Sequence, residues 1–420
     1  MAGSDQAVIR KRVREGIVVH RKKTQTDAAV YGFSPQAAPA ANAQALQNAV
    51  AACEAVRVSS PGIYEISGTV RLPSDTHLVF APGATLRRMP LQDPLSEGNL
   101  FVNDGAFTGT FNENISIDGA HVVVNGVESA AISSDGSAET IRRTPNVVTG
   151  LRGHLAFLYV RHLRIKNILI TDLLSKDYGI QVSDFEDVTI ENVHIEGKKD
   201  GVHFGPGSGF VLRNGRFRTG DDAIALNCAD YAVSNPNFGT ISDGLIENCV
   251  ELPGAESGLF IRILVGTARD WEQGMTVRHS DAVRTKNGMY RVVMRPDDTC
   301  RVSETEPCFE ETCRELDGIF WVKTHRGYAA DEIPLDAGCR NIRFRNLMLA
   351  HPRTRAVLIY RNDDAYLHSW YPGSAMPQVE DLLFENVQLL KPVESFLCIE
   401  TPVENVAVQG GDPVIDAVME

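Results

Sequence analysis

The sequence predicts an all-β chain that winds into a parallel β-helix, a solenoid in which each coil stacks on the one before it. Two observations support this prediction. A short motif, in which Asn interrupts alternating apolar residues, recurs along the chain, and a second set of short apolar strands recurs between its copies. Both sets begin with a period in the low twenties, which suits a solenoid because each coil buries its inner face only against its neighbours.

The Asn motif sets the period of the predicted coils. The first and second copies are 25 residues apart, and the second and third are 22 apart. Asparagine at one recurring turn predicts hydrogen-bonded ladders along the stack. Leucine-rich repeats have similar periods, but their Leu pattern is absent from this chain. The motif reads RIKNILI, TIENVHI, VLRNGRF, LIENCVEL, RFRNLML and LLFENVQL, around Asn167, Asn192, Asn214, Asn248, Asn346 and Asn386.

The second set of strands predicts successive rungs of one sheet. It reads DYGIQV, DGVHF, DAIAL, SGLFIRI, GIFWVKT and AVLIY, starting at residues 177, 200, 222, 257, 318 and 356. Because side chains alternate across a strand, half of them point into the core and half lie on the outer face. The expected core residues are Val202, Phe204, Ile224, Leu226, Leu259, Ile261 and Ile263. The expected outer residues are Gln181, His203, Ala225, Phe260, Arg262, Trp321, Lys323 and Tyr360.

Two further segments complete the predicted architecture. The Ala-rich stretch 41–53 predicts a helix that caps the open end of the solenoid. We therefore divide the chain into an N-terminal segment with the capping helix, residues 1–60, and a β-helix over residues 61–420, together forming one domain. The largest insertion, at about 264–317, is rich in Arg, Asp and Glu, and long loops on a solenoid often form the wall of a binding groove.

Composition excludes several classes of protein. The net charge of -13 argues against a general nucleic-acid binder, and no stretch reaches the ~18 apolar residues of a membrane span. Eight cysteines in 420 residues are too few for a disulfide scaffold. Cys300, Cys308 and Cys313 lie close in sequence without a CxxC pair, which favours buried thiols or one disulfide over a metal site.

Three aspartates are the predicted reactive groups. Asp200 and Asp222 occupy equivalent positions on adjacent rungs and should lie about 5 Å apart, with Asp221 just before them in the turn. Three carboxylates at this distance repel one another, so the pKa of at least one should rise. Hydrolysis of a glycosidic bond needs such a protonated acid beside ionised partners. GDD alone is common turn chemistry, and calcium binding is the competing use of a carboxylate cluster.

Residues on the outer face suggest how a sugar polymer would bind in a groove along the sheet. Arg262 and Lys323 carry the positive charge that an anionic sugar needs, and Trp321 offers a ring on which a sugar can stack. His203 is a weaker candidate, because exposed histidines are common on strands.

The sequence resembles glycoside hydrolase family 28, which comprises the polygalacturonases and rhamnogalacturonan hydrolases. This family belongs to the pectin-lyase-like superfamily of right-handed parallel β-helices. The resemblance is strongest in PGIYEISGTVRLPSDTHLVFAPGATLRR, residues 61–88, and in residues 152–226, which contain KKDG and TGDDAIAL; it extends to about residue 390. It implies that Asp221 is the general acid and that Asp200 and Asp222 activate water, with inversion at the anomeric carbon.

The chain departs from the family pattern at two places. Ser257 in ESGLF stands where the family has a histidine, and Trp321 stands where it has an arginine, although Lys323 keeps the family's lysine. Arg262, His325 and Arg326 are candidates to compensate. The resemblance implies a uronic-acid-containing, pectin-like polysaccharide or oligosaccharide as substrate, with no cofactor and no metal.

Two alternatives to hydrolysis stay open at the level of sequence. A β-elimination lyase would use a basic Lys or Arg and often calcium. A carbohydrate-binding β-helix without catalysis is favoured by the missing histidine and opposed by the three retained aspartates. The large insertion favours exo action. Oligomeric state is left open, and the expected compartment is the periplasm or the exterior if a signal peptide has been removed, and the cytoplasm if Met1 is the native start.

Overall fold

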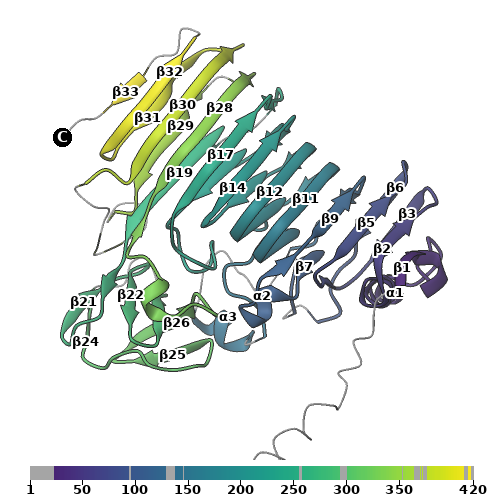
Figure 1. The fold of residues 1–420 in the computed structure, drawn as a ribbon, viewed down its shortest axis with the longest axis horizontal. Helices are drawn as coiled ribbons and strands as arrows, with labels where there is room; N and C mark the ends of the chain where they lie inside the picture. The colour runs from purple at the N-terminus through teal and green to yellow at the C-terminus, as the bar shows by residue number, and fades with distance from the viewer. Residues whose placement is uncertain are drawn as a thin grey trace, which may run out of the picture.

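The chain forms the predicted right-handed parallel β-helix. The computed structural model describes residues 23–93, 96–128, 138–144, 146–254, 258–293, 300–351, 353–363, 369, 371, 376–410 and 415–417. Successive coils stack along one axis, and a smaller β-rich lobe projects from one side of the stack (Figure 1).

Strands of successive coils pair in parallel and form three columns. The first column contains β4(Val70–Leu72), β7(Phe101–Asn103), the start of β11(Leu155–Leu173), the start of β12(Ile180–Gly197), β13(Val202–Phe204), β16(Ile224–Asn227), β19(Ile261–Thr267), β29(Arg353–Arg361), β31(Val393–Ile399) and β33(Ile415–Ala417). The second contains β1(Lys23–Asp27), β2(Cys53–Val58), β5(Thr76–Phe80), β8(Asn112–Glu113), β9(Ile115–Asp118), the middle of β11 and of β12, β14(Gly207–Arg213), β17(Ile241–Glu247), β28(Cys339–Leu349), β30(Val379–Leu389) and β32(Val403–Gln409). The third contains β3(Gly62–Ile66), β6(Ala84–Arg88), β10(His121–Val123), the ends of β11 and β12, β15(Arg216–Thr219), β18(Val250–Glu251) and the ends of β28 and β30.

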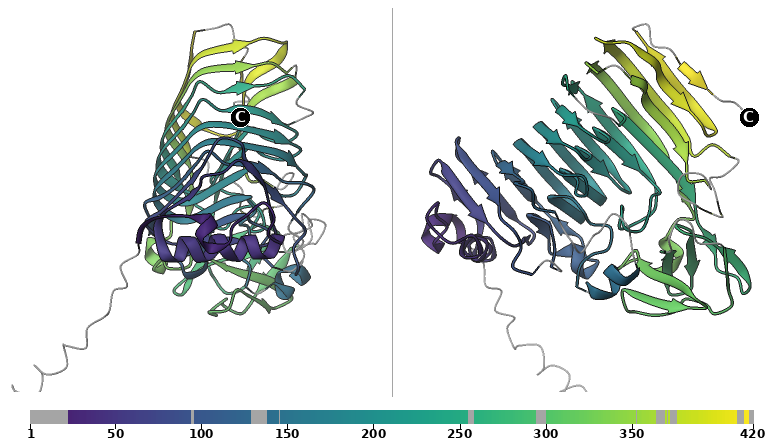
Figure 2. Two further views of the ribbon diagram at one scale, coloured as in Figure 1. Left: turned by 90° about the vertical axis from the view of Figure 1, so that its right-hand side faces the viewer. Right: turned by 180° about the vertical axis from the view of Figure 1, so that it is seen from behind.

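The predicted capping helix is present as α1(Pro39–Ala52). It lies across the first coil (Figure 2) and buries Leu46, Ala49 and Val50 completely. Strands β1 and β2 pair with each other and β2 pairs with β5, so the sheet begins before residue 61. The other helical segments are η2(Ala28–Tyr31), α2(Gly105–Thr108), α3(Ala138–Arg143) and η3(Ala330–Glu332). Within the described residues, no helix has the length and apolarity needed to cross a membrane.

The interior of the coils is one continuous apolar core. Six of the seven residues predicted to point inward are fully buried in it: Val202, Phe204, Ile224, Leu226, Ile261 and Ile263. Leu259, the seventh, is only half-buried, because the strand that follows begins later, at Ile261. Stacking of like apolar residues about 4.7–4.9 Å apart therefore removes the inner face of the central coils from water, whereas the valines of β32 at the C-terminal end stay partly exposed.

The predicted asparagine ladder is present along the second column. Each asparagine side chain donates to the one on the preceding coil: Asn192 to Asn167 at 3.1 Å, Asn214 to Asn192 at 3.0 Å and Asn248 to Asn214 at 3.3 Å. The ladder continues through Asn346 and Asn386. All six have φ between 53° and 57°, a left-handed conformation that Asn tolerates better than other residues with a Cβ.

The insertion is a small lobe with its own core, and it is longer than predicted. A five-stranded sheet is built from β20(Arg269–Asp270), β22(Ala282–Thr285), β23(Gly288–Val292), β26(Ile319–Thr324) and β25(Cys313–Leu316), next to a hairpin-like pair of β21(Met275–Val277) and β24(Arg301–Ser303). GIFWVKT was predicted as a rung of the β-helix, and this is wrong. It forms β26, which pairs antiparallel with β23 and β25. Strand β27(Asp336–Ala337) then returns the chain to β19.

The cysteines of the insertion form neither a disulfide nor a buried cluster. All eight cysteines of the chain are free thiols. Cys308 is exposed, and Cys300 and Cys313 are half-buried. The prediction of buried thiols or one disulfide is therefore wrong for these three, because none of them is part of the buried apolar core of the lobe.

The asparagine ladder predicts a graded loss of stability. Asn214→Ala removes two ladder hydrogen bonds and leaves a Cβ in the left-handed conformation, so the free energy of unfolding should fall by about 1–2 kcal/mol. Asn214→Gly removes the same bonds without the backbone penalty and should lose less. Urea unfolding measures both, and equal losses for the two variants would contradict a contribution from backbone conformation.

Candidate active site

The parallel register brings the three predicted aspartates together. Val202 on β13 aligns with Ile224 on β16, and the backbone nitrogen of Gly201 donates to the carbonyl of Asp222 at 2.9 Å. Asp200 and Asp222 therefore stand at the same position on adjacent coils, as predicted. One carboxylate oxygen from each of Asp200, Asp221 and Asp222 lies within 4.8 Å of the others.

Gly201 is required for this close stacking. A Cβ at this position would lie 2.6 Å from the carbonyl oxygen of Ala223 on the next coil and 2.7 Å from the ring of Phe217. Neither neighbour is a flexible chain end, so any side chain here would push the two coils apart. The glycine that follows Asp200 thus keeps the neighbouring turns at hydrogen-bonding distance.

Asp200 is a buried carboxylate with two cationic or polar partners. Only 1% of the residue is exposed, its Oδ2 contacts His203 Nδ1 at 2.9 Å, and its Oδ1 lies 3.5 Å from Lys199 Nζ. Burial by itself raises the pKa of Asp200, but the charge of Lys199 and the hydrogen bond from His203 outweigh it and hold the pKa well below its usual range. Asp200 is therefore ionised at neutral pH.

For Asp222, unlike Asp200, the effect of burial on the pKa outweighs that of the neighbouring cation. Asp222 is 2% exposed, accepts from the backbone nitrogen of Leu259 at 3.3 Å and lies 3.4 Å from Arg262 Nη1. Burial raises the pKa of Asp222 to about 7; Arg262 opposes this shift, and the neighbouring carboxylates Asp200 and Asp221 add to it. The site thus contains a carboxyl group that can carry a proton near neutral pH.

Lys199 is a member of this cluster that the sequence reasoning missed. Its Nζ contacts the Asp221 carboxylate, and the Lys199 and Asp221 side chains are 18% and 35% exposed. Burial lowers the pKa of Lys199, but Asp200, Tyr178 and Asp221 raise it further, so the pKa lies above its ordinary value. The signal was available in the register, because Lys199 stands one coil before Asp221 at the same position.

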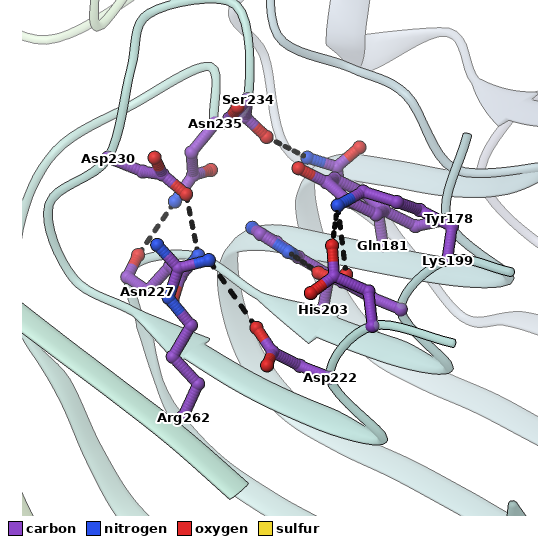
Figure 3. A network of polar contacts seen from close by, with 12 residues as sticks. Tyr178, Gln181, Lys199, His203, Asp222, Asn227, Asp230, Ser234, Asn235 and Arg262 are labelled. Atoms are coloured by element: carbon purple, nitrogen blue, oxygen red, sulfur yellow. Dashed lines mark hydrogen bonds and ion pairs between the residues drawn. The ribbon is translucent and has the colours of Figure 1, made fainter. Parts of the chain in front are cut away.

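The cluster does not suit a metal ion. The three carboxylates supply the oxygen ligands that calcium takes. However, the ammonium group of Lys199 already contacts two of the three, Asp200 and Asp221. Arg262 faces the third, Asp222 (Figure 3). A divalent cation would have to share this space with a fixed positive charge, so the residues around the carboxylates do not fit the calcium alternative.

His203 and Gln181 do not line an open groove. Both are fully buried, although they lie on the outer face of the first column as predicted. His203 stacks on Tyr178 with the ring centroids 4.1 Å apart. Gln181 donates to the carbonyls of Gly150 and Ser234 at 2.9 and 3.2 Å. His203 is therefore a partner of Asp200, and its predicted contact with substrate is not available in this structure.

The outer face of the first column is covered over several coils. Residues 228–238 fold back over it: Asn235 donates to the carbonyl of Asn227 at 2.7 Å and its amide lies where a Cβ on Gly205 would be. The lobe then holds this loop from outside through Arg291, which donates to the carbonyl of Asn235 at 2.7 Å. The expected long groove along the sheet is therefore closed here, since the outward Ala225 and Leu264 are also fully buried.

Three other predicted binding residues lie elsewhere or outside the described residues. Trp321 is fully buried in the core of the lobe with Tyr290 and Phe309, so it offers no surface for a sugar ring. Lys323 is on the same strand and pairs with Glu310 at 2.7 Å. Ser257 lies outside the described residues. Of the predicted cations, only Arg262 lies against an aspartate of the site.

The two further candidates to replace the family's cation also have other contacts. His325 is buried and its backbone nitrogen donates to the side chain of Asn237 at 2.8 Å, while its ring contacts the carbonyl of Phe238. Arg326 donates to Thr312 at 2.6 Å. His325 therefore joins the lobe to the loop 228–238, whereas Arg326 makes its contact within the lobe, and neither contact places a cation beside the aspartates.

Comparison with known proteins gives weak likenesses. No family model matches the chain. A stretch of 78 residues, 17% of the chain, is 32% identical to an exopolygalacturonase of Platanus acerifolia, and this match spans 20% of that protein. The chain thus matches about a fifth of the length of this curated relative.

Solved structures resemble the chain at low identity. The family 28 exopolygalacturonase of Yersinia enterocolitica is 14% identical, with 94% of this chain and 80% of that chain covered and a TM-score of 0.40. The surface protein and adhesin PfbA of Streptococcus pneumoniae is 13% identical, with 94% and 100% covered and a TM-score of 0.40. We therefore derive the activity from the residues of the site.

The raised pKa of Asp222 predicts a pH-dependent stability. Between the usual value near 3.8 and about 7, native Asp222 holds a proton that the unfolded chain has released, so its contribution to stability falls as pH rises through this window. Asp222→Asn removes this titration. The melting temperature of the variant minus that of the wild type should therefore be larger at pH 8 than at pH 5, measured by calorimetry.

Asp200 does not obscure this measurement. Its pKa is lowered, so the stability it contributes is present above its unfolded value and is constant between pH 5 and pH 8. If the difference in melting temperature is the same at both pH values, Asp222 is already ionised at pH 5.

Proposed function

We propose that the protein is a glycoside hydrolase that cleaves a polysaccharide or oligosaccharide with Asp200, Asp221 and Asp222. The observation that carries the proposal is the pairing of a buried carboxyl group of raised pKa, Asp222, with an ionised carboxylate, Asp200, on the neighbouring coil. Hydrolysis of a glycosidic bond needs one group to protonate the leaving oxygen and one to activate water.

The chemistry can be assigned to these groups in two parts. The acid belongs to the adjacent pair Asp221 and Asp222, and the resemblance to family 28 gives it to Asp221. Asp200, held ionised by Lys199 and His203, supplies the base that takes a proton from water. Of the three side chains, that of Asp221 is the most exposed and so meets the substrate most directly. No cofactor takes part in this reaction.

The stereochemical outcome rests on the resemblance, which implies inversion. The three carboxylates approach within 4.8 Å of one another, whereas inverting enzymes usually separate theirs by about 6.5–9.5 Å to leave room for water. Proton NMR of the first product anomer distinguishes inversion from retention.

The covered outer face supports action at a chain end. A long polymer could not lie along the first column, because loop 228–238 and the lobe bury the positions it would contact. A terminal sugar or a short oligosaccharide needs only the turn that carries the aspartates. The uronic-acid, pectin-like nature of the substrate rests on the resemblance, with Arg262 as the supporting cation beside Asp222.

The proposal predicts loss of activity in three variants. A panel of plant and microbial glycans is first screened for new reducing ends released by the wild type. On the best substrate, Asp200→Asn, Asp221→Asn and Asp222→Asn should each lower kcat/KM by at least about 10²–10⁴-fold, with circular dichroism unchanged. Asp331→Asn, an exposed aspartate in η3, serves as the matched control and should keep full activity.

Two results would go against hydrolysis at this site. Full activity in the Asp221→Asn and Asp222→Asn variants would remove the site from the reaction. A wild type that binds a glycan of the panel but releases no reducing ends would support the carbohydrate-binding alternative.

The covered face predicts the product pattern. Chromatography of an early time point should show a single small sugar released from the polymer, with little fall in viscosity, because only a chain end reaches the aspartates. A ladder of intermediate oligosaccharides at the earliest times would indicate cleavage within the chain and an open groove.

A further inference from the structure

Charges of alternating sign follow the turn that carries the aspartates. Leu155, Ile180, Val202 and Ile224 are in register on four successive coils. The residues three positions before them are therefore also aligned from coil to coil. These residues are Arg152, Asp177, Lys199 and Asp221, so positive and negative side chains alternate along the stack.

Lys199 is the cation of this column that reaches the site. Its Nζ contacts Asp221 on the next coil and lies 3.5 Å from Asp200 Oδ1 on its own coil. The same ammonium lies 5.7 Å from the ring centroid of Tyr178. One positive charge thus faces two carboxylates, one of them buried at 1% exposure.

Asp222 is placed differently from these two carboxylates. Its Oδ2 lies 3.4 Å from Arg262, a cation that also lies over the ring of Tyr360. Asp200, in contrast, has a second side-chain partner, His203, at 2.9 Å. Asp222 has no contact with Lys199 as close as those of Asp200 and Asp221. Its carboxyl group therefore lies buried beside two carboxyl groups that Lys199 already contacts.

We propose that Lys199 is a positioning residue of this site: its ammonium group holds Asp200 and Asp221 as a pair of carboxylates, so that the exchangeable proton of the three resides on Asp222. The role of Lys199 in catalysis rests on the proposed hydrolase function, whereas its effect on the protonation of the three aspartates does not. Within that function it makes Asp222, and not Asp221, the group from which the leaving oxygen receives its proton.

The surrounding charges support the same distribution. The titratable and charged groups that face the three carboxylates from the neighbouring coils and from loop 228–238 are Arg152, Asp177, Tyr178, His203, Asp230 and Arg262. Arg152 lies over the ring of Tyr178, with its Cζ 4.9 Å from the ring centroid. Asp230 is occupied by Asn227, which donates to it at 2.6 Å. Lys199 remains the cation that contacts both Asp200 and Asp221.

A titration that needs no substrate tests the proposal. The full chain is labelled with ¹³C at the aspartate carboxyl carbon, and the three signals are assigned with the Asp→Asn variants. In the wild type, Asp222 is expected to titrate near neutral pH, while Asp200 keeps its carboxylate shift down to pH 5. In Lys199→Met, a second carboxyl group should titrate higher by roughly 1–3 pH units, because an opposite charge at this distance has been removed.

Two matched variants separate charge from shape. Lys199→Arg keeps the positive charge and should restore the wild-type titration to within about half a pH unit. Lys198→Met removes the same charge from the adjacent, exposed lysine and should change nothing. If Lys199→Met lowers stability but leaves the titrations of all three carboxyl groups unchanged, the proposal is overturned. Lys199 would then be a structural residue only.

The pH dependence of hydrolysis gives the second measurement. With a substrate found in the glycan screen, the acidic limb of kcat/KM should move up by roughly 1–3 pH units in Lys199→Met and stay in place in Lys199→Arg. An unchanged profile in Lys199→Met would overturn the proposal even if activity falls. If no glycan is cleaved, the hydrolase function fails, and the carboxyl titration still decides whether Lys199 sets the protonation of the three aspartates.

Discussion

Main-chain hydrogen bonds between successive coils in parallel register are the interaction on which both the fold and the site depend. They bring Gly201 against Asp222 and hence Asp200 beside Asp222. The asparagine ladder on the second column fixes the same register from the outer side, because each amide can meet its neighbour only when the coils are aligned. Without this register, repulsion between the carboxylates would drive the aspartates apart. The coils hold the aspartates at a distance that their charges alone would not allow.

Sequence reasoning succeeded where the repeat itself carried the information. The Asn motif predicted the ladder, alternation predicted the buried faces of β13 and β16, and the 22-residue offset of Asp200 and Asp222 predicted their proximity. These features are local or periodic, so they can be counted along the chain. Lys199 lies at the same 22-residue offset from Asp221, but a lysine in a turn is usually a solvated surface residue, so its position alone does not indicate a role.

Prediction from the sequence failed where tertiary packing overrode a local pattern. GIFWVKT alternates like a rung, yet its strand pairs with β23 and β25 in the lobe, because Trp321 and Ile319 find an apolar core there. Alternation shows which side chains share a face and does not show which sheet the strand joins. Likewise, an outward position on a strand does not show what covers it: loop 228–238 covers Gln181, and the ring of Tyr178 stacks on His203.

The column of alternating charges also bears on how such a solenoid can lengthen or shorten. Gain of one coil between Arg152 and Asp221 would place two like charges next to each other, whereas gain of two would keep every neighbour opposite in sign. At this turn, therefore, only an even change in the number of coils keeps opposite charges next to each other. Duplication or deletion of coils near the aspartates is electrostatically tolerated in even numbers, while the apolar core and the asparagine ladder accept any number.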